Sequence, residues 1–163
     1  MHDVSDLVIE AVANSIEAGA ERIAVSIAIA DGVVNARISD NGVFTLEGNP
    51  FREGITTKGE GRGQGLHIIY KRSEGRCRLT RGDGITELEF SAEDDGSFDE
   101  LDKALLPLLG MDDGITVKIR KNNREMEITR SLLEKWDAVP DRAGRIGRFR
   151  ALIHSLEKGE IYG

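Results

Sequence analysis

Residues 7–20 read LVIEAVANSIEAGA, and this stretch decides how the rest of the chain is interpreted. Apolar side chains recur in it, and just before it, every three or four residues, which is the spacing of one face of an α-helix. The pattern predicts a helix over residues 4–18, with Asp3 or Ser5 as its N-terminal cap and Gly19 closing its C-terminal end. The apolar stripe of this helix consists of Val4, Leu7, Val8, Ala11, Val12 and Ile16.

The opposite face of the expected helix carries polar side chains. Glu10, Asn14 and Glu17 are four and three residues apart, so they share that face. They can simply be the solvated side of an amphipathic helix. Asparagine is, however, a poor residue for a helix interior, and an amide oxygen beside a carboxylate suits Mg²⁺ and its waters. The sequence alone leaves both interpretations open.

The chain between residues 20 and 91 reads as two strand pairs separated by a long loop and a second helix. Apolar residues alternate with small or polar ones around Asp31-Gly32, a dipeptide typical of two-residue hairpin turns. The segment 40–65 has seven glycines and no period, which is typical of a functional lid. This order predicts an α+β two-layer sandwich, with helices covering one face of an antiparallel sheet. The expected elements are strands over 23–29 and 33–39, a helix over 66–73, and a hairpin over 76–91 that turns at Gly82-Asp83-Gly84.

Glycines alternate at the end of the long loop. Gly59, Gly61, Gly63 and Gly65 directly precede the helix that is expected to begin at Leu66. Such a run lets successive backbone N–H groups turn toward one point, and a helix N-terminus adds partial positive charge there. A plain flexible loop would have the same composition. The absence of Gly-Lys-Ser/Thr and of G-x-G-x-x-G excludes a P-loop and a dinucleotide fingerprint.

Asp40-Asn41-Gly42 stands where a strand runs out into that loop. A turn explains all three residues without any function. A carboxylate at a strand end can also accept a hydrogen bond from the exocyclic amine of a purine, and Gly42 would let the base ring approach the backbone.

Taken in order, these segments resemble the motifs of the GHKL ATPases, the superfamily of gyrase, heat-shock chaperone ATPases, histidine kinases and MutL. The likeness covers residues 3–91 and implies the Bergerat ATP-binding fold. The N box resembles the MutL and gyrase form, whereas the second glycine box and the F box resemble those of histidine kinases. The matching segments are 7–20 (N box), Asp40-Asn41-Gly42 (first glycine box), 50–54 (F box), Thr56-Thr57-Lys58 with Gly61–Leu66 (second glycine box) and Gly84–Leu88 (closing strand with its adenine-side threonine).

The resemblance implies a role for individual residues. Asn14 would ligate Mg²⁺, and Glu10 would be catalytic, orienting or deprotonating the attacking water. Asp40 would accept a hydrogen bond from the adenine amine, directly and through a water shared with Thr86, while Lys58 would meet the γ-phosphate. The implied ATP-binding set is Asn14, Asp40, Gly42, Thr57, Lys58, Gly61, Gly63, Gly65, Leu66 and Thr86.

Two positions depart from the family pattern. Phe44 stands where the first glycine box usually has a second glycine. A phenylalanine there would make the hinge of the lid stiffer or change how the base stacks. Glu17 replaces the aspartate common in the MutL and gyrase form, and its role stays undefined.

Residues 1–91 are thus expected to form the ATP-binding domain, and residues 92–163 a small C-terminal α/β extension of undefined role. Ser97-Phe98-Asp99-Glu100 reads as a capping box that opens a short helix, which Pro107 and Gly110 end. The arginines of the helix expected over 141–157 are interpreted as a solvated face, in preference to a contact with phosphate or an acidic partner. The other expected elements are an acidic linker over 93–96, a hairpin of 115–120 and 125–129 that turns at Asn122-Asn123, and an amphipathic helix over 141–157.

Composition narrows the class of protein. A chain of 163 residues with 39% hydrophobic and 31% charged residues suits a globular domain, and its net charge of −7 gives no electrostatic reason to expect nucleic acid or an anionic membrane as partner. The single cysteine, Cys77, is expected to be an inert, buried or half-buried thiol. Neither a signal peptide nor an apolar stretch of membrane-spanning length is present, so we expect a cytoplasmic protein.

Three functions stay open for an ATP-binding chain of this kind. It could be a slow Mg²⁺-dependent ATPase that switches contacts with a protein partner, a protein serine/threonine kinase of the anti-sigma-factor type, or a module that senses ATP without chemistry. Glu10 favours the first two. A complete sensor histidine kinase is not expected, because no helical hairpin with a phosphoacceptor histidine precedes the first helix. A homodimer is left open.

Overall fold

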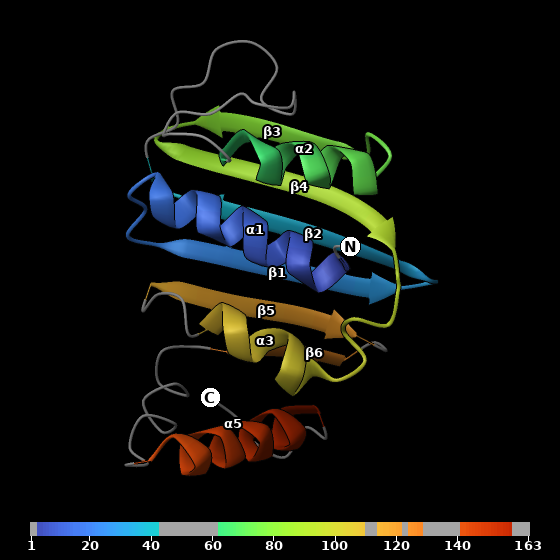
Figure 1. Ribbon diagram of the computed structural model, residues 1–163, viewed down its shortest axis with the longest axis vertical. Helices are drawn as coiled ribbons and strands as arrows, with labels where there is room; N and C mark the ends of the chain where they lie inside the picture. The colour runs from blue at the N-terminus through green and yellow to red at the C-terminus, as the bar shows by residue number, and fades with distance from the viewer. Residues whose placement is uncertain (1–2, 43–61, 110–113, 122–123, 129–140, 158–163) are drawn as a thin grey trace.

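The computed structural model describes residues 3–42, 62–109, 114–121, 124–128 and 141–157. They form one six-stranded sheet of order β3-β4-β2-β1-β5-β6, together with four described helices (Figure 1). The α+β class expected from the sequence is confirmed. In chain order the elements are α1 Val4–Glu17, β1 Ile23–Ala30, β2 Val33–Asp40, α2 Arg62–Arg72, β3 Cys77–Gly82, β4 Ile85–Glu93, α3 Leu101–Leu109, β5 Ile115–Lys121, β6 Arg124–Ile128 and α5 Arg142–Glu157.

The sheet is mostly antiparallel. β1 and β2 form the expected hairpin, β4 pairs antiparallel with both β2 and β3, and β6 pairs antiparallel with β5. Of the strand pairs in the described residues, only β1 and β5 run parallel. Asp31 (φ 53°) and Gly32 (φ 76°) close the first hairpin with positive φ at both turn positions, the conformation that a two-residue turn of this kind requires.

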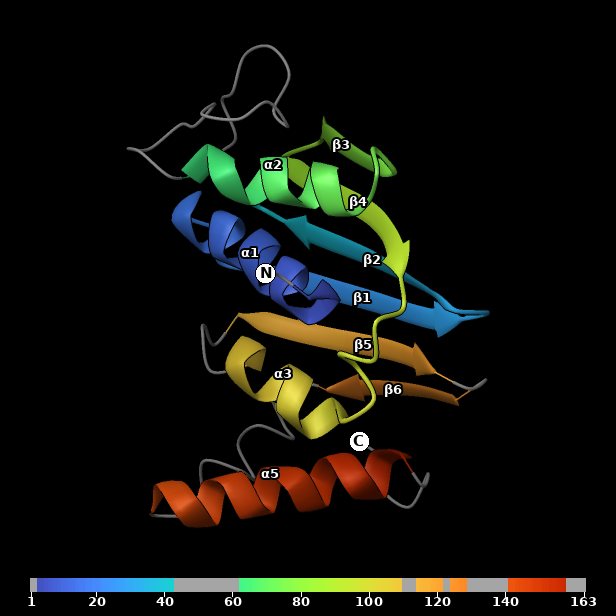
Figure 2. The same ribbon diagram turned by 45° about the vertical axis from the view of Figure 1, so that its right-hand side comes forward.

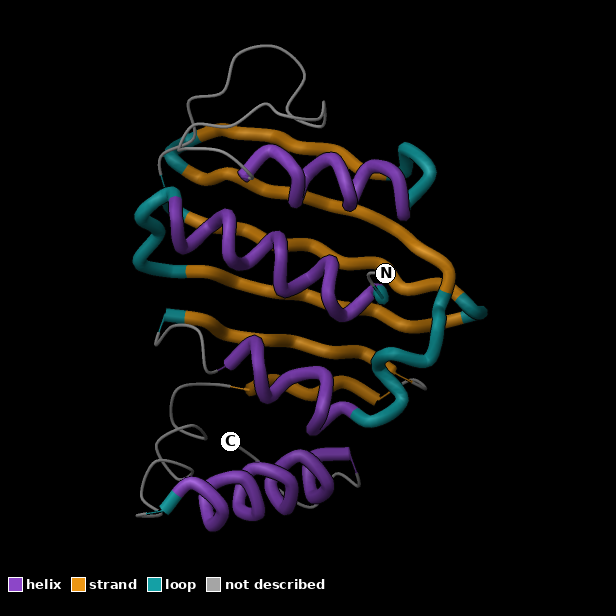
Figure 3. The backbone as a smooth tube through the Cα atoms, in the orientation of Figure 1, coloured by secondary structure: helices purple, strands orange, loops and turns teal. Residues whose placement is uncertain are grey.

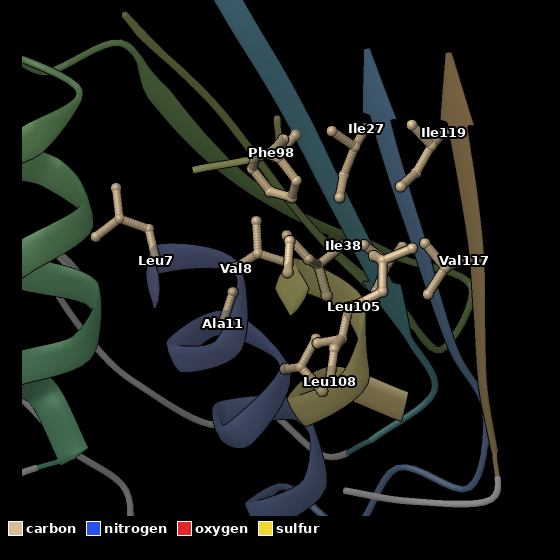
Figure 4. Packing of buried hydrophobic residues seen from close by; sticks show 14 of the residues in the cluster. Leu7, Val8, Ala11, Ile27, Ile38, Phe98, Leu105, Leu108, Val117 and Ile119 are labelled. Atoms are coloured by element: carbon tan, nitrogen blue, oxygen red, sulfur yellow. The ribbon is translucent and has the colours of Figure 1, made fainter. Parts of the chain in front are cut away.

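Helices α1, α2 and α3 lie on the same face of the sheet (Figures 1 and 2). Along β1, β2 and β5 every second side chain is buried under these helices, as the two-residue period of a strand demands. Figure 4 shows α1 and α3 contributing to one continuous core with the strands. The labelled members of this core are Leu7, Val8, Ala11, Ile27, Ile38, Phe98, Leu105, Leu108, Val117 and Ile119.

Helix α1 is capped at both ends as the sequence predicts. The Asp3 carboxylate accepts a hydrogen bond from the Asp6 N–H, and the Asp6 carboxylate accepts one from the Asp3 N–H. At the other end Gly19 has a φ of 79° and donates to the Ile16 carbonyl, while Ala20 donates to the Ser15 carbonyl. This is the double hydrogen-bond pattern of a Schellman motif.

Helix α2 begins at Arg62, four residues earlier than expected. Gly63 and Gly65 therefore belong to the first turns of the helix instead of preceding it. Glycine disfavours a helix but does not forbid it, and burial of Leu66 and Ile69 against the core stabilises the segment that follows. The prediction of a glycine run entirely outside the helix is wrong for these two residues.

Residues 94–100 connect β4 to α3, and this connection passes beside the start of α1 (Figure 3). The Asp95 carboxylate accepts a hydrogen bond from the Val4 N–H at 3.0 Å, and Ser97 Oγ accepts one from the Ser5 N–H at 3.1 Å. These are backbone donors that a helix N-terminus leaves without partners of its own. Ser97 was expected to cap α3, but its hydroxyl oxygen serves α1.

The tail continues the same sheet and core. The predicted domain boundary at residue 91 lies inside β4, and β5 extends the sheet beyond β1. Pro107 lies within α3 and does not end it. Helix α5 contacts α3 and β6 and buries Phe149 and Ile153 in the common core. The division of the chain into a domain and an extension stays a prediction. None of the described helices is long and apolar enough to cross a membrane.

Candidate functional site

Asp40 is a buried carboxylate at the end of β2. Only 8% of the residue is exposed. Its Oδ2 accepts a hydrogen bond from Ser15 Oγ at 2.6 Å, and its Oδ1 accepts one from the Gly42 N–H at 2.8 Å. Ser15 is on α1, so this contact ties the helix to the strand end. A carboxylate has about four acceptor positions, so Asp40 keeps capacity for a ligand that donates.

Thr86 and Arg81 lie in line with Asp40 across the sheet. Thr86 pairs with Asp40 between β2 and β4, and Arg81 pairs with Thr86 between β4 and β3. Thr86 is buried, with 5% exposed. Arg81 Nη1 donates to Thr86 Oγ1 and, at 3.0 Å, to the Gly42 carbonyl. We call Asp40, Thr86 and Arg81 the polar row; it lies on the face of the sheet that the helices cover.

Gly42 is required by packing. A Cβ at this position would lie 2.9 Å from Ala18 Cβ and 2.9 Å from the Ala18 carbonyl oxygen. Its neighbour Asn41 accepts hydrogen bonds through Oδ1 from the N–H groups of Glu21 and Arg22. The Asp40-Asn41-Gly42 turn is thus held against the end of α1. A place for Gly42 beside a base ring stays a prediction, whereas its close approach to Ala18 is a packing reason for glycine here.

Asn14 and Glu10 lie on α1, the helix whose Ser15 contacts Asp40. Asn14 directly precedes Ser15, and its Nδ2 is buried without a hydrogen-bond partner in the described part of the chain. An unsatisfied buried polar group costs about 1–3 kcal/mol, so such a group calls for a partner. Glu10 is half-buried one helical turn earlier, on the same side of the helix as Asn14.

The other predicted site residues are distributed as follows. Leu66 is buried in the core on α2, a helix that packs against α1. Gly63 and Gly65 belong to the first turns of the same helix. The structure thus brings Asp40, Thr86 and Gly42 together and places α2 next to α1. Thr57, Lys58 and Gly61, with the Phe44 position, lie outside the described residues.

Ser15 and Arg81 contact the predicted site residues Asp40 and Thr86 but were not themselves predicted. The sequence pattern could have indicated both. Ser15 is four residues after Ala11 and seven after Val8, which puts it on the apolar stripe, where Ile16 was expected; Ser15 is buried and Ile16 only half-buried. Arg81 is on the same strand face as Leu79, so alternation turns it toward the helices.

Cys77 is half-buried on β3, as expected. Burial raises the pKa of its thiol, and the hydrogen bond with Ser73 only partly offsets this. A raised pKa lowers the thiolate fraction at neutral pH, so the thiol is a weak nucleophile. Among the residues that the structure describes, no three His, Cys, Asp or Glu side chains gather as a metal cluster.

The chain matched no known protein family when it was scanned against family models, and no curated protein when it was compared with those.

Proposed function

We propose that this chain binds ATP with Mg²⁺ in a Bergerat-type pocket formed by α1, α2 and the β2–β4 strand pair. The observation that carries the proposal is the buried pair of Asp40 and Thr86, adjacent across two strands under α1. A buried carboxylate is unfavourable unless it is hydrogen-bonded. Its position at a strand end suits the recognition of a donor such as the adenine amine. The motif resemblance described above supports the same assignment.

The side chains and backbone groups of α1 and α2 are chemically suited to bind ATP and Mg²⁺. Mg²⁺ is commonly held by one or two protein ligands together with substrate phosphates, and the Asn14 amide oxygen is such a ligand. The buried Asn14 Nδ2 gives an independent reason, because a phosphate oxygen would supply the acceptor that it does not find among the described residues. The backbone N–H groups of the first turn of α2 cannot bond within the helix itself, and such groups are suited to hold phosphate.

Glu10 is the residue that we assign to chemistry. Bound ATP supplies the phosphoanhydride bond that is cleaved. A half-buried carboxylate one turn from Asn14 would orient a water molecule and accept its proton, which gives slow hydrolysis. The same carboxylate could instead accept a proton from a serine or threonine hydroxyl of a partner protein, in which case the chain is a kinase. Without either step it is an ATP sensor. The cytoplasm, where ATP is plentiful, is the location that we propose.

The test is calorimetric titration of Mg-ATP into wild type and two isosteric variants. Asp40→Asn keeps the side-chain shape but puts an amide donor where the adenine amine needs an acceptor. We expect it to weaken binding about 10–150-fold, the equivalent of about 1.5–3 kcal/mol for a hydrogen bond with a charged group. Glu87→Gln is the matched control, because Glu87 is next to Thr86 on β4 but points to the face of the sheet opposite α1, α2 and α3, where it pairs with Arg37. Equal affinities in folded Asp40→Asn and in the control would refute the adenine assignment.

A further inference from the structure

Arg81 is the member of the polar row that no motif assigns. It lies on β3, an edge strand of the described sheet, and its register partner on β4 is Thr86. Its guanidinium nevertheless reaches the buried side of the sheet and donates to both Thr86 Oγ1 and the Gly42 carbonyl. Arg81 as a whole residue is exposed, yet one of the two partners of its guanidinium is a buried hydroxyl.

The chemistry of the guanidinium fixes how the Thr86 hydroxyl is used. A guanidinium only donates hydrogen bonds, so Thr86 Oγ1 must be the acceptor in this contact. The hydroxyl hydrogen then points away from Arg81, and none of the hydrogen bonds between described residues uses it as a donor. Thr86 therefore offers a donor to whatever occupies the pocket.

Asp40 has the opposite hydrogen-bonding character to the Thr86 hydroxyl, because it presents only acceptors. Both of its oxygens already accept hydrogen bonds, from Ser15 and Gly42, and a carboxylate has nothing to donate. Together the two residues present an acceptor next to a donor. The edge of adenine that carries the 6-amine and N1 has the complementary order, a donor next to an acceptor. Hypoxanthine and guanine carry a carbonyl and an N–H at those positions, which is the reverse order.

We propose that Arg81 is a positioning residue that sets purine selectivity: it fixes the Thr86 hydroxyl as a donor, so that Asp40 and Thr86 together accept adenine and reject 6-oxopurines. This inference rests on the proposed function and names the residue that makes the site specific. Arg81 acts through Thr86 and does not itself contact the base.

The experiment measures the affinities of Mg-ATP and Mg-ITP, which differ only at the 6-position and N1 of the base. Arg81→Gln is the main variant, because glutamine can both donate to and accept from Thr86 and so releases the hydroxyl from its fixed role. Arg81→Ala removes the contact altogether. Arg78→Ala is the matched control on the same strand, since Arg78 lies on the face opposite α1, α2 and α3 and pairs with Glu89.

We expect wild type and Arg78→Ala to prefer ATP to ITP by about tenfold or more, the effect of one mismatched buried hydrogen bond. The preference should fall by at least about threefold in Arg81→Gln and Arg81→Ala. In a Thr86→Val background, Arg81→Gln should change the preference no further.

Several outcomes would overturn the inference. A loss of ATP and ITP affinity in equal proportion in the Arg81 variants would show that Arg81 only supports the fold near Gly42. A full Arg81→Gln effect in the Thr86→Val background would show that Arg81 does not act through Thr86. If wild type binds neither nucleotide, the proposed function itself fails, and that result is distinct from an unchanged selectivity in a protein that binds ATP.

Discussion

Substituting Gly42 with alanine should destabilise the fold where the site is built. The added Cβ would lie 2.9 Å from Ala18 Cβ, 2.9 Å from the Ala18 carbonyl oxygen and 3.1 Å from the Ala20 amide nitrogen. Two of these three atoms are backbone, so a side-chain rotation cannot relieve the contact. The turn that carries Asp40 must instead move away from the end of α1.

The expected cost follows from these distances. Overpacking of a well-packed site typically costs about 1–3 kcal/mol. For a chain of this size each kcal/mol lowers Tm by about 2–4 °C, so we expect Gly42→Ala to lower Tm by about 2–12 °C. Because the same movement shifts Asp40 relative to Ser15, ATP affinity should fall as well.

Thermal unfolding followed by circular dichroism measures this effect. Gly82→Ala is the matched control, since a Cβ at Gly82 meets nothing within 4 Å and the residue does not have a positive φ. Ala18→Gly should partly rescue Gly42→Ala, because it removes one of the three close contacts. If Gly42→Ala and Gly82→Ala unfold at the same temperature, the close packing of the Asp40 turn against α1 is wrong.

Three further results are expected. Glu10→Gln should keep ATP affinity within about twofold and lower turnover by about 10²–10⁴-fold in a phosphate-release assay. If wild type alone releases no phosphate, the assay is repeated with candidate partner proteins. Turnover at the wild-type rate in the variant would show that Glu10 has no catalytic role. Asn14→Ala should lose the Mg²⁺-dependent part of ATP affinity, measured as the ratio of affinities with Mg²⁺ and with EDTA, and an unchanged ratio would exclude Asn14 as a ligand. Asp95→Asn should lower stability in urea unfolding at pH 7, and the difference from wild type should shrink as the pH falls below about 3.9. Burial alone would raise the pKa of Asp95, but hydrogen bonds from Ser97 and Val4 lower it. The contribution of the carboxylate is therefore present above the ordinary carboxyl pKa and is lost as the pH falls through the lowered value. A difference between Asp95→Asn and wild type that does not change with pH would contradict this account of Asp95.

Local pattern was sufficient to predict the described secondary structure closely. The alternation of Ile23, Val25, Ile27 and Ile29 and the turn at Asp31-Gly32 correspond to β1 and its hairpin, because a strand with one buried face must repeat every two residues. The cap at Asp3 and the end at Gly19 could be read for the same reason, since both are set by hydrogen bonds within a few residues.

Contacts between distant residues could not be read from local pattern. Nothing near Ser97 in the sequence indicates that its hydroxyl accepts from Ser5, and nothing near Ile115 indicates that β5 pairs with β1. The same limit applied to the site. Asp40 and Thr86 could be singled out by motif order, but the contacts of Asp40 with Ser15 and of Arg81 with Thr86 depend on strand register and on how α1 packs.

The most direct measurement is a crystal structure of the protein with Mg²⁺ and a non-hydrolysable ATP analogue. We predict the adenine amine within about 3.2 Å of an Asp40 oxygen, the range of an ordinary N–H···O hydrogen bond, and the Asn14 amide oxygen coordinated to the ion. Thr86 should donate toward the base while it still accepts from Arg81. A nucleotide bound elsewhere, with Asp40 contacting only Ser15 and Gly42, would contradict the proposed function.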